Sequence, residues 1–571
     1  MKTFHVHTLG CKVNHYEGEQ VAAVLRSFGL VETDVSHADL RVVNTCSVTS
    51  EAASKSRQST RRMVRLPVLE GRASVTAVTQ DDVPIDLGSS RRPRVIVTGC
   101  WATSDRDEAA RLPGVDAVLT HHGDVAAELR ELLLLWRGEE QCGGRRNEPD
   151  APKDVESGNG SGPQHRERRA PADSPIEPVG PRAERPPEHQ WNDGWIEQVG
   201  LPARAGTTGS KAAPPEKVNL QKDALPFDAP PEMLPGQDGY VSASGTTRLP
   251  LLGDRQTGRQ RAFLKIQDGC DAHCTYCIIP RLRRTVWSKP VLDAVDEARR
   301  LVAAGHVEVV LTGVFLSAYG HGTALRRRRP EPGQEEPLAE LIEALCTRVS
   351  GLRRLRLSSL EPGDLTERLV AVLRSHTQVV PHFHLPLQSG ADRVLRRMNR
   401  QYTRDDYLRM LDRVLHAFDR PALTTDVIVG FPGETDDAFQ RTVEVVDQAG
   451  FVHVHAFPFS PRPGTAAARW AGRFVPGKVV NQRLGELSKR AEQHSLSFRE
   501  KFVGGAVEVL VERNEQPGGL VRRGRCERYF DVHFEAPDAL PGDFARVRVD
   551  QVTPGRTRGT LLSIERAGGV A

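Results

Sequence analysis

The sequence predicts an α/β protein with three folded parts. These are a Rossmann-like α/β domain at residues 1–141, a partial (β/α)6 barrel at residues 256–495 and a small β-barrel at residues 500–568. Apolar runs of strand type alternate with helix-like segments in the first two parts, and such alternation indicates parallel sheets. The last part has short β-rich runs between Gly and Pro turns, which are typical of a small barrel.

The first part holds three strand-like runs, and a cysteine closely follows each of them. The runs are Phe4–Thr8, Leu40–Asn44 and Val95–Thr98, and the cysteines are Cys11, Cys46 and Cys100. Helix-like segments, such as Glu17–Phe28 and Glu51–Arg65, lie between the runs. Because the carboxyl ends of parallel strands meet at one edge of a sheet, we expect these three cysteines to converge.

The second part predicts six β/α units and therefore a partial barrel. The strand candidates are Ala262–Ile266, Val307–Thr312, Leu352–Leu357, Phe383–Leu387, Leu423–Val429 and His453–Pro458. The helix candidates are Val291–Ala304, Leu338–Val349, Leu365–Arg374, Arg404–Phe418 and Asp436–Ala449. In barrels of this kind the active site lies at the carboxyl ends of the strands.

Residues 142–255 separate the two α/β parts and are predicted to be a disordered insertion. Residues 142–260 hold 17 of the chain's 39 prolines, with Gly, Ser and charged residues filling much of the rest. A segment of this composition cannot bury enough apolar surface to offset the entropy of ordering it. A shorter stretch, about residues 67–92, is interpreted as an added loop.

Charge and hydropathy exclude some classes of protein. The formal net charge is only +4, so the total says little about partners. No run of about 18 apolar residues is present, which argues against a membrane span. The start of the chain lacks the basic segment and apolar stretch of a signal peptide, so a cytoplasmic protein is expected. The run Arg326–Arg329 is followed at once by glutamates and is interpreted as a solvated face.

Near the C-terminus, four arginines crowd a short stretch of the predicted β-barrel. They are Arg522, Arg523, Arg525 and Arg528. Such a cluster creates a local positive field that can bind RNA phosphates. Tyr529 and Phe530, which follow, could stack on exposed bases. The alternative is that the arginines are merely solvated and the aromatic rings pack inside the barrel.

Nine cysteines in a cytoplasmic chain favour metal binding or catalysis over a disulfide framework. Cys142, Cys346 and Cys526 lie in unremarkable contexts and are interpreted as structural or incidental. The strongest motif is Cys270-Asp271-Ala272-His273-Cys274-Thr275-Tyr276-Cys277, directly after the first barrel strand. Three thiolates on one loop can hold three irons of a four-iron cluster and leave the fourth iron open for S-adenosylmethionine. The alternative is a zinc site with His273 as fourth ligand.

Other loops after the barrel strands are candidates for binding S-adenosylmethionine. They offer backbone groups, hydroxyls, a carboxylate and glycines that permit close approach. The candidate residues are Thr312, Gly313, Ser358, Glu361, Gln388, Gly430 and Gly433. Each is weak alone, but all follow strands of one predicted barrel.

With these motifs in view, the chain resembles the methylthiotransferase family of radical-SAM enzymes over its length except residues 142–255 and 67–92. The first set of motifs is Thr8-Leu9-Gly10-Cys11, Asn44-Thr45-Cys46 and Thr98-Gly99-Cys100. The barrel set is Cys270–Cys277 with Ile278-Ile279-Pro280, Ser358–Pro362, His384–Gly390 and Gly430–Glu434. The tail resembles the RNA-binding TRAM module, a small β-barrel.

The resemblance implies two [4Fe–4S] clusters and S-adenosylmethionine as cofactors. Cys270, Cys274 and Cys277 would hold the radical-generating cluster, and Cys11, Cys46 and Cys100 a second cluster that carries the sulfur. One S-adenosylmethionine would methylate that sulfur, and another would supply the radical that takes a hydrogen from the substrate carbon. No catalytic residue beyond the cluster ligands is assigned. The implied partners are the anticodon loop of tRNA and a reducing electron donor such as flavodoxin or ferredoxin.

Within the family, Gly10-Cys11-Lys12-Val13-Asn14 resembles the bacterial branch acting on carbon 2 of N(6)-threonylcarbamoyladenosine at position 37 of tRNA, next to the anticodon. The isopentenyladenosine branch usually reads Gly-Cys-Gln-Met-Asn, and the ribosomal-protein branch Gly-Cys-Pro-Lys-Asn. Both remain alternatives, as does a non-catalytic iron–sulfur RNA-binding protein. Arg284, Phe315 and Ser317 depart from the family pattern without removing a cluster ligand.

We expect most of residues 150–255 to be dispensable for the chemistry. Loop closure depends only weakly on length, so a shortened flexible link should cost little stability. The measurements are iron content and tRNA modification by a chain with this segment shortened. A shortened protein that keeps its iron but cannot modify tRNA would show that the insertion has a role of its own.

Overall fold

The fold is described by a computed structural model for residues 1–69, 92–143, 240–241, 247–253, 260–329, 331, 335–513 and 519–566. Residues 1–144 and 231–571 belong to one unit. Most of the predicted insertion, residues 142–255, and most of the predicted loop, residues 67–92, lie outside the described residues. In the described ranges no helix is both long and apolar enough to cross a membrane.

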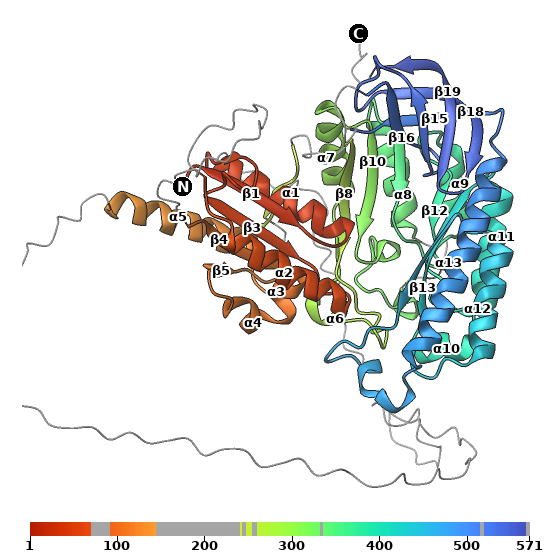
Figure 1. Ribbon diagram of the computed structural model, residues 1–571, viewed down its shortest axis with the longest axis horizontal. Helices are drawn as coiled ribbons and strands as arrows, with labels where there is room; N and C mark the ends of the chain where they lie inside the picture. Colours follow the sequence, from red (N-terminus) through yellow and green to blue (C-terminus); the bar gives the residue numbers. More distant parts are fainter. Residues whose placement is uncertain are drawn as a thin grey trace, which may run out of the picture. The chain divides into compact units, whose positions relative to one another are not determined.

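The N-terminal sheet has five parallel strands in the order β2-β1-β3-β4-β5 (Figure 1). The strands are β1 (Thr3–Thr8), β2 (Val31–Glu32), β3 (Leu40–Thr45), β4 (Arg94–Gly99) and β5 (Ala117–Val118). The helices are α1 (Lys12–Ser27), α2 (Ser50–Arg65), α3 (Cys100–Ser104), α4 (Arg106–Ala110) and α5 (Val125–Gly143). Every residue of β3 is buried, as expected for the central strand of a sheet covered on both faces.

The second part contains six parallel strands that form an open, partial barrel. They are β8 (Arg261–Asp268), β10 (Glu308–Gly313), β11 (Arg354–Leu357), β12 (His382–His384), β13 (Ala422–Val429) and β14 (His453–Pro458). They form two sheets, β11-β10-β8-β9 and β12-β13-β14, in which β9 (Trp287–Ser288) is an antiparallel edge strand. Single bridges between Leu355 and Val379 and between Ser359 and His384 join the two sheets.

Helices cover the outside of these strands (Figure 1). Five match the sequence prediction: α7 (Val291–Ala303), α8 (Pro337–Arg348), α9 (Glu367–Ser375), α11 (Arg404–Ala417) and α12 (Asp436–Ala449). Three were not predicted: α6 (Ile279–Leu282), α10 (Asp392–Arg397) and α13 (Gly477–Glu500). Thr403 and Asp406 form a capping box at the start of α11, and Gly450 ends α12 in the left-handed conformation.

Two strand boundaries differ from the prediction for physical reasons. The run Phe383–Leu387 was expected to be one strand, but β12 ends at His384. Pro386 has no amide hydrogen to donate to a ladder, and Gln388 takes a positive φ of 59°. In the tail, Tyr529–Phe534 is one of the β-rich runs that the sequence predicts, but its strand starts only at Asp531, because Tyr529 has a φ of 70° and lies in a turn.

The tail is a closed barrel of five strands, in the order β15-β16-β17-β19-β18. The strands are β15 (Ala506–Val511), β16 (Val521–Cys526), β17 (Asp531–Glu535), β18 (Phe544–Thr553) and β19 (Arg556–Glu565). Its core holds apolar side chains at alternating positions, such as Val507, Val509 and Val511 of β15. A short pair, β6 (Tyr240–Val241) and β7 (Thr247–Arg248), completes the described strands. The predicted fold class is therefore confirmed.

Buried arginines of β11 tie the tail barrel to the partial barrel. Arg356 Nε donates to Glu308 Oε1 at 2.6 Å, while its other nitrogens donate to the backbone oxygens of Cys526 and Glu527, both at 2.9 Å. Arg354 bonds the backbone oxygens of Glu508 and Arg525. Because the guanidinium offers five donors in a fixed plane, one side chain can satisfy a carboxylate and several carbonyls at once.

Candidate iron–sulfur and cofactor site

The three N-terminal cysteines converge on Asn14. Cys11 caps the start of α1, Cys46 follows β3 and Cys100 begins α3. Cys11 Sγ lies 4.0 Å from Asn14 Oδ1, and Cys100 Sγ lies 3.9 Å from it. A Cβ at Gly10 would lie 2.8 Å from Cys46 Sγ, so glycine is required there, where φ is also positive at 98°. Three thiols that are distant in sequence thus gather around one place.

Asn14 is held in position by its amide nitrogen. Nδ2 donates to Leu9 O at 2.9 Å and to Thr45 O at 2.8 Å. These bonds join the loop after β1 to the loop after β3 and orient Oδ1 toward the thiols. Sequence reasoning did not assign a role to Asn14, although it stands in the quoted motif.

The chemistry of this donor set fits an iron–sulfur cluster. All three are free cysteines, and two of them, Cys46 and Cys100, are buried. Burial raises the pKa of Cys100 to about 12 and also raises that of Cys46. Thiols in such surroundings become thiolates when they bind a cation, and three thiolates around one point are what a cluster with one open iron requires.

The second set of cysteines lies on the loop after β8. Cys270, Cys274 and Cys277 are partly buried, and burial raises the pKa of Cys270 to about 11 and that of Cys277 to about 12. The loop is pinned to the segment after α10, because Thr275 N donates to Met398 O at 3.0 Å and Thr275 Oγ1 to Arg397 O at 2.8 Å. A short loop with three ligands at fixed places again fits a cluster.

The zinc alternative finds no support in this geometry. No group of three or more Cys, His, Asp or Glu side chains within the described ranges is arranged to hold a metal ion. Tetrahedral zinc with bonds of about 2.3 Å needs sulfurs about 3.8 Å apart, whereas a four-iron cluster holds its ligands farther apart. His273, the suggested fourth ligand, is exposed.

Arg400 is a site residue that the sequence did not reveal. Its Nη1 donates to Cys274 Sγ at 3.3 Å and lies 3.5 Å from the Tyr276 hydroxyl. Its Nη2 forms an ion pair with Glu361, one of the predicted cofactor residues. Arg400 stands among other arginines after α10, so no sequence signal separates it from its neighbours.

The structure places the other predicted cofactor residues at the carboxyl ends of the barrel strands. Thr312 and Gly313 end β10, Gln388 follows β12, and Gly430 and Gly433 follow β13. Ser358 follows β11, and its Oγ is buried without a hydrogen-bond partner among the described residues. A buried hydroxyl of this kind is ready to bond a ligand. These assignments stay predictions.

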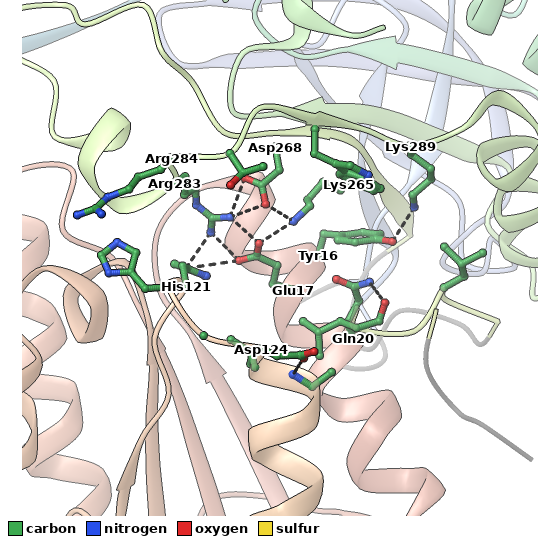
Figure 2. Close-up of a pocket in the computed structure, with 18 of the residues that line it drawn as sticks. Tyr16, Glu17, Gln20, His121, Asp124, Lys265, Asp268, Arg283, Arg284 and Lys289 are labelled. Carbon is green, nitrogen blue, oxygen red and sulfur yellow. Dashed lines mark hydrogen bonds and ion pairs between the residues drawn. The ribbon is translucent and has the colours of Figure 1, made fainter. Parts of the chain in front are cut away.

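A network of buried charges links α1 to the cysteine loop of the barrel (Figure 2). Arg283 donates to Glu17 Oε2 at 2.7 Å and to both carboxylate oxygens of Asp268 at 2.9 Å. Lys265 Nζ donates to Glu17 and to Asp268, each at 2.8 Å. The residues line a cavity of about 400 Å³ that His121 also borders.

These charges hold one another in the ionised form. Burial alone raises the pKa of Asp268, but Arg283 and Lys265 bring it down to about 2; they also hold the pKa of Glu17 well below its usual range. Glu17 is on the helix that starts after Cys11, and Asp268 ends the strand before Cys270. The network therefore sets the relation between the two cysteine sets. Arg284, which departs from the family pattern, is exposed and outside this ion pairing.

The four tail arginines lie on β16 and the turn after it, and most are engaged. Arg522 donates to three backbone oxygens of the tail, Arg525 pairs with Asp531 at 2.8 Å, and Arg528 donates to Asp419 O and Arg420 O. Arg523 is the most exposed, at 48 %, and its nearest carboxylates lie 3.7 and 3.8 Å away.

Tyr529 and Phe530 both pack against protein side chains, as the alternative interpretation expected, and both stay partly exposed. The Tyr529 ring stacks on His382 with centroids 4.4 Å apart, and Phe530 packs against Phe498 and Phe502. Stacking of these rings on RNA bases therefore stays a prediction. The interpretation of Arg326–Arg329 as a solvated face needs correction only at its ends, because Arg326 and Arg329 pair with Asp364 while Arg327 and Arg328 are exposed.

Comparison with protein families matches two parts of the chain. Residues 264–446 match the radical-SAM superfamily, and residues 3–120 match the uncharacterized protein family UPF0004. The first match covers the partial barrel with its cysteine loop. The second covers the N-terminal sheet with the other three cysteines.

Several named proteins are similar to nearly the whole chain. The threonylcarbamoyladenosine tRNA methylthiotransferase of Bacillus subtilis is 29 % identical over 96 % of this chain and 94 % of its own length. The tRNA-2-methylthio-N(6)-dimethylallyladenosine synthase of Acidothermus cellulolyticus is 30 % identical over 97 % of this chain and 86 % of its own length. A radical S-adenosylmethionine methyltransferase of Kitasatospora setae, solved with cobalamin and a [4Fe–4S] cluster, gives a TM-score of 0.44 at 14 % identity, covering 82 % and 74 % of the two chains.

We expect anaerobic reconstitution to load about eight irons per chain, four on each cysteine set. Replacing Cys270, Cys274 and Cys277 with Ala should halve the iron, and so should replacing Cys11, Cys46 and Cys100. Iron and sulfide analysis together with the visible absorption spectrum provides the measurement. The matched control is Cys346→Ala, a buried cysteine of α8 that should leave the iron unchanged. Full iron in either triple variant would refute the ligand assignment.

Proposed function

The chain belongs to the methylthiotransferase family of radical-SAM enzymes, and from this premise we propose that its substrate is N(6)-threonylcarbamoyladenosine at position 37 of tRNA. The product would carry a methylthio group on carbon 2 in place of hydrogen. The observation that carries the proposed methylthio transfer is the pair of cysteine sets. One set follows β1, β3 and β4, and the other follows β8. A structural cluster alone would not need two incomplete sets of ligands.

The family implies S-adenosylmethionine and a [4Fe–4S] cluster, which we assign to Cys270, Cys274 and Cys277. We propose a second [4Fe–4S] cluster on Cys11, Cys46 and Cys100. Bound together, these cofactors supply the electron, the deoxyadenosyl radical, the methyl group and the sulfur. The electron donor is proposed to be a small reducing protein such as flavodoxin or ferredoxin, which fits a cytoplasmic reaction.

The chain's own residues orient the reactants and compensate charge. Arg400 Nη1 donates to Cys274 Sγ at 3.3 Å and so holds that side of the cysteine loop in place. Its ion pair fixes Glu361, and together with the Ser358 hydroxyl this carboxylate offers hydrogen bonds for a ribose. Gly430 and Gly433 have positive φ and leave the backbone after β13 open to close approach. The ion network of Glu17, Arg283 and Asp268 holds the two cysteine loops together.

For the substrate branch, support comes from the motif Gly10-Cys11-Lys12-Val13-Asn14 and from the name of the Bacillus relative. The relative named for dimethylallyladenosine is equally similar, so overall identity does not separate the two substrates. We propose residues 1–141 as the domain of the second cluster, residues 256–495 as the radical-SAM domain and residues 500–568 as the RNA-binding TRAM domain, with the insertion 142–255 between the first two.

We expect tRNA from a strain lacking this chain to lose the 2-methylthio form of N(6)-threonylcarbamoyladenosine while the unmodified nucleoside accumulates. The measurement is nucleoside mass spectrometry of total tRNA, with the chain returned on a plasmid as the control. Loss of the 2-methylthio form of dimethylallyladenosine instead would contradict the proposed substrate and support the other branch. Unchanged tRNA together with a shift in the mass of a ribosomal protein would support the ribosomal-protein branch of the family.

The four tail arginines are proposed to contact RNA phosphates, with Arg523 the most available. Arg523→Ser should weaken tRNA binding and reduce the salt slope by about 0.7 to 0.9, as expected when one phosphate contact is lost. The matched control is Arg441→Ser, which removes one exposed charge from α12. Binding measured between low and physiological salt gives both quantities. Equal slopes for the Arg523 variant and the unchanged protein would show that this arginine does not meet the RNA backbone.

A further inference from the structure

Lys12 carries an ammonium group that forms no ion pair with any other described residue. It is the first residue of α1, directly after Cys11, and its side chain is partly buried. Among the residues that the structure describes, none forms a hydrogen bond or an ion pair with its ammonium group. The charges and ionisable groups that act on it belong to Tyr529, Arg261, Arg356 and Asp426. These come from the tail barrel, β8, β11 and β13, so Lys12 faces the inside of the partial barrel.

The other cations near this place have partners. Arg261 pairs with Glu512 at 3.1 Å, Arg356 with Glu308 at 2.6 Å and Arg525 with Asp531 at 2.8 Å. Lys12 differs from these three cations, because no described residue pairs with its ammonium group. An ammonium group that is partly removed from water loses hydration, and an anion in direct contact restores that loss.

Opposite Lys12 lies a face of histidines and one aspartate, which we call the histidine face: His384, Asp426, His453 and His455. These residues occupy alternating positions of neighbouring parallel strands, so their side chains share one side of the sheet. His384 Nε2 lies 3.3 Å from Asp426 Oδ2, and the rings of His384 and His455 are 6.0 Å apart. The charge of Lys12 acts on His455. His453 and His455 are exposed, so a ligand can reach this face.

The histidine face continues to the N-terminal set of cysteines. His455 stacks on Phe457 with centroids 6.3 Å apart and an interplanar angle of 11°. Phe457 in turn lines a cavity of about 320 Å³ together with Gly10 and Cys46.

We propose that Lys12 is a specificity residue that binds the threonyl carboxylate of the substrate nucleoside. This inference rests on the proposed function. In adenine, carbon 2 and the carbon bearing N6 both flank N1, so a group that recognises the N6 substituent must stand close to the sulfur delivered to carbon 2. Lys12 is next in the chain to Cys11 and meets this condition. A dimethylallyl group carries no charge and offers nothing to an ammonium group.

A second source of the same anionic chemistry is a phosphate of the tRNA backbone. The two sources differ in one measurable respect. A phosphate is present whatever stands at position 37, whereas the carboxylate is present only with the threonylcarbamoyl group. A neutral methyl ester of that group keeps the size and removes the charge.

The test uses the reconstituted holoenzyme and three anticodon stem-loop RNAs that differ only at position 37. One carries N(6)-threonylcarbamoyladenosine, one its methyl ester and one adenosine. The unchanged enzyme should bind the first about 10- to 100-fold more tightly than the other two, the size expected of one charge-assisted hydrogen bond. Lys12→Met and Lys12→Gln should remove this preference, and Lys12→Arg should retain part of it. Lys501→Met, an exposed lysine after α13, is the matched control.

The outcomes separate this inference from the proposed function. The iron content of each variant is measured to show whether Cys11, next to Lys12, still binds its cluster. If Lys12→Met loses iron, Lys12→Gln and Lys12→Arg take its place in the binding experiment. Equal weakening of all three RNAs by Lys12→Met would assign the ammonium to a backbone phosphate and overturn the inference. A preserved preference in the Met and Gln variants, with the 2-methylthio product still formed by the unchanged enzyme, would overturn the inference alone. Failure of the unchanged enzyme to modify the threonylcarbamoyl RNA would overturn both.

Discussion

The ion network of Glu17, Lys265, Asp268 and Arg283 is the constraint on which the site depends. Arg283 is 4 % exposed and bonds a carboxylate on each side, one from α1 and one from the end of β8. The gain from such a buried pairing is offset by the loss of hydration, but removal of one partner would leave a charge buried alone. The network therefore adds little to the net free energy of folding, but it fixes the position of α1 relative to β8. Because Glu17 follows Cys11 on α1 and Asp268 precedes Cys270, it sets how the two cysteine loops face one another.

Buried arginines join several pairs of structural elements in this chain. Arg356 joins β11 to the turn of the tail barrel, and Arg400 joins the segment after α10 to the cysteine loop and to Glu361. Arg41 of β3 bonds the backbone oxygens at the end of α2. In each case a planar guanidinium supplies up to five donors in a fixed plane, whereas a lysine ammonium has three donors on one atom. Lys12, by contrast with these three arginines, forms no hydrogen bond or ion pair with another described residue.

The tail barrel packs against the partial barrel and lies near the candidate site. Through Arg354 and Arg356 it is fastened to the partial barrel, and its turn places Tyr529 on His382 and near Lys12. The tail thereby contributes to the surroundings of the histidine face. The RNA-binding role proposed for it rests on the outer side of β16, where Arg523 is exposed. One small barrel thus has a face toward the site and a face available to a polyanion.

The sequence by itself determined the fold class and the cysteine pattern, because both depend on local signals. Alternation of apolar runs and helical segments is visible along the chain, and a cysteine after each of β1, β3, β4 and β8 stands at the carboxyl end of a parallel strand. Tertiary structure alone decided which polar side chains meet. Asn14 lies between the thiols of Cys11 and Cys100, and Arg400 lies beside Cys274. The charge of Asp426, which is distant in sequence, acts on Lys12. Arg326 and Arg329 were misread for the same reason: whether a charge is exposed depends on what packs against it, and no local pattern records that partner.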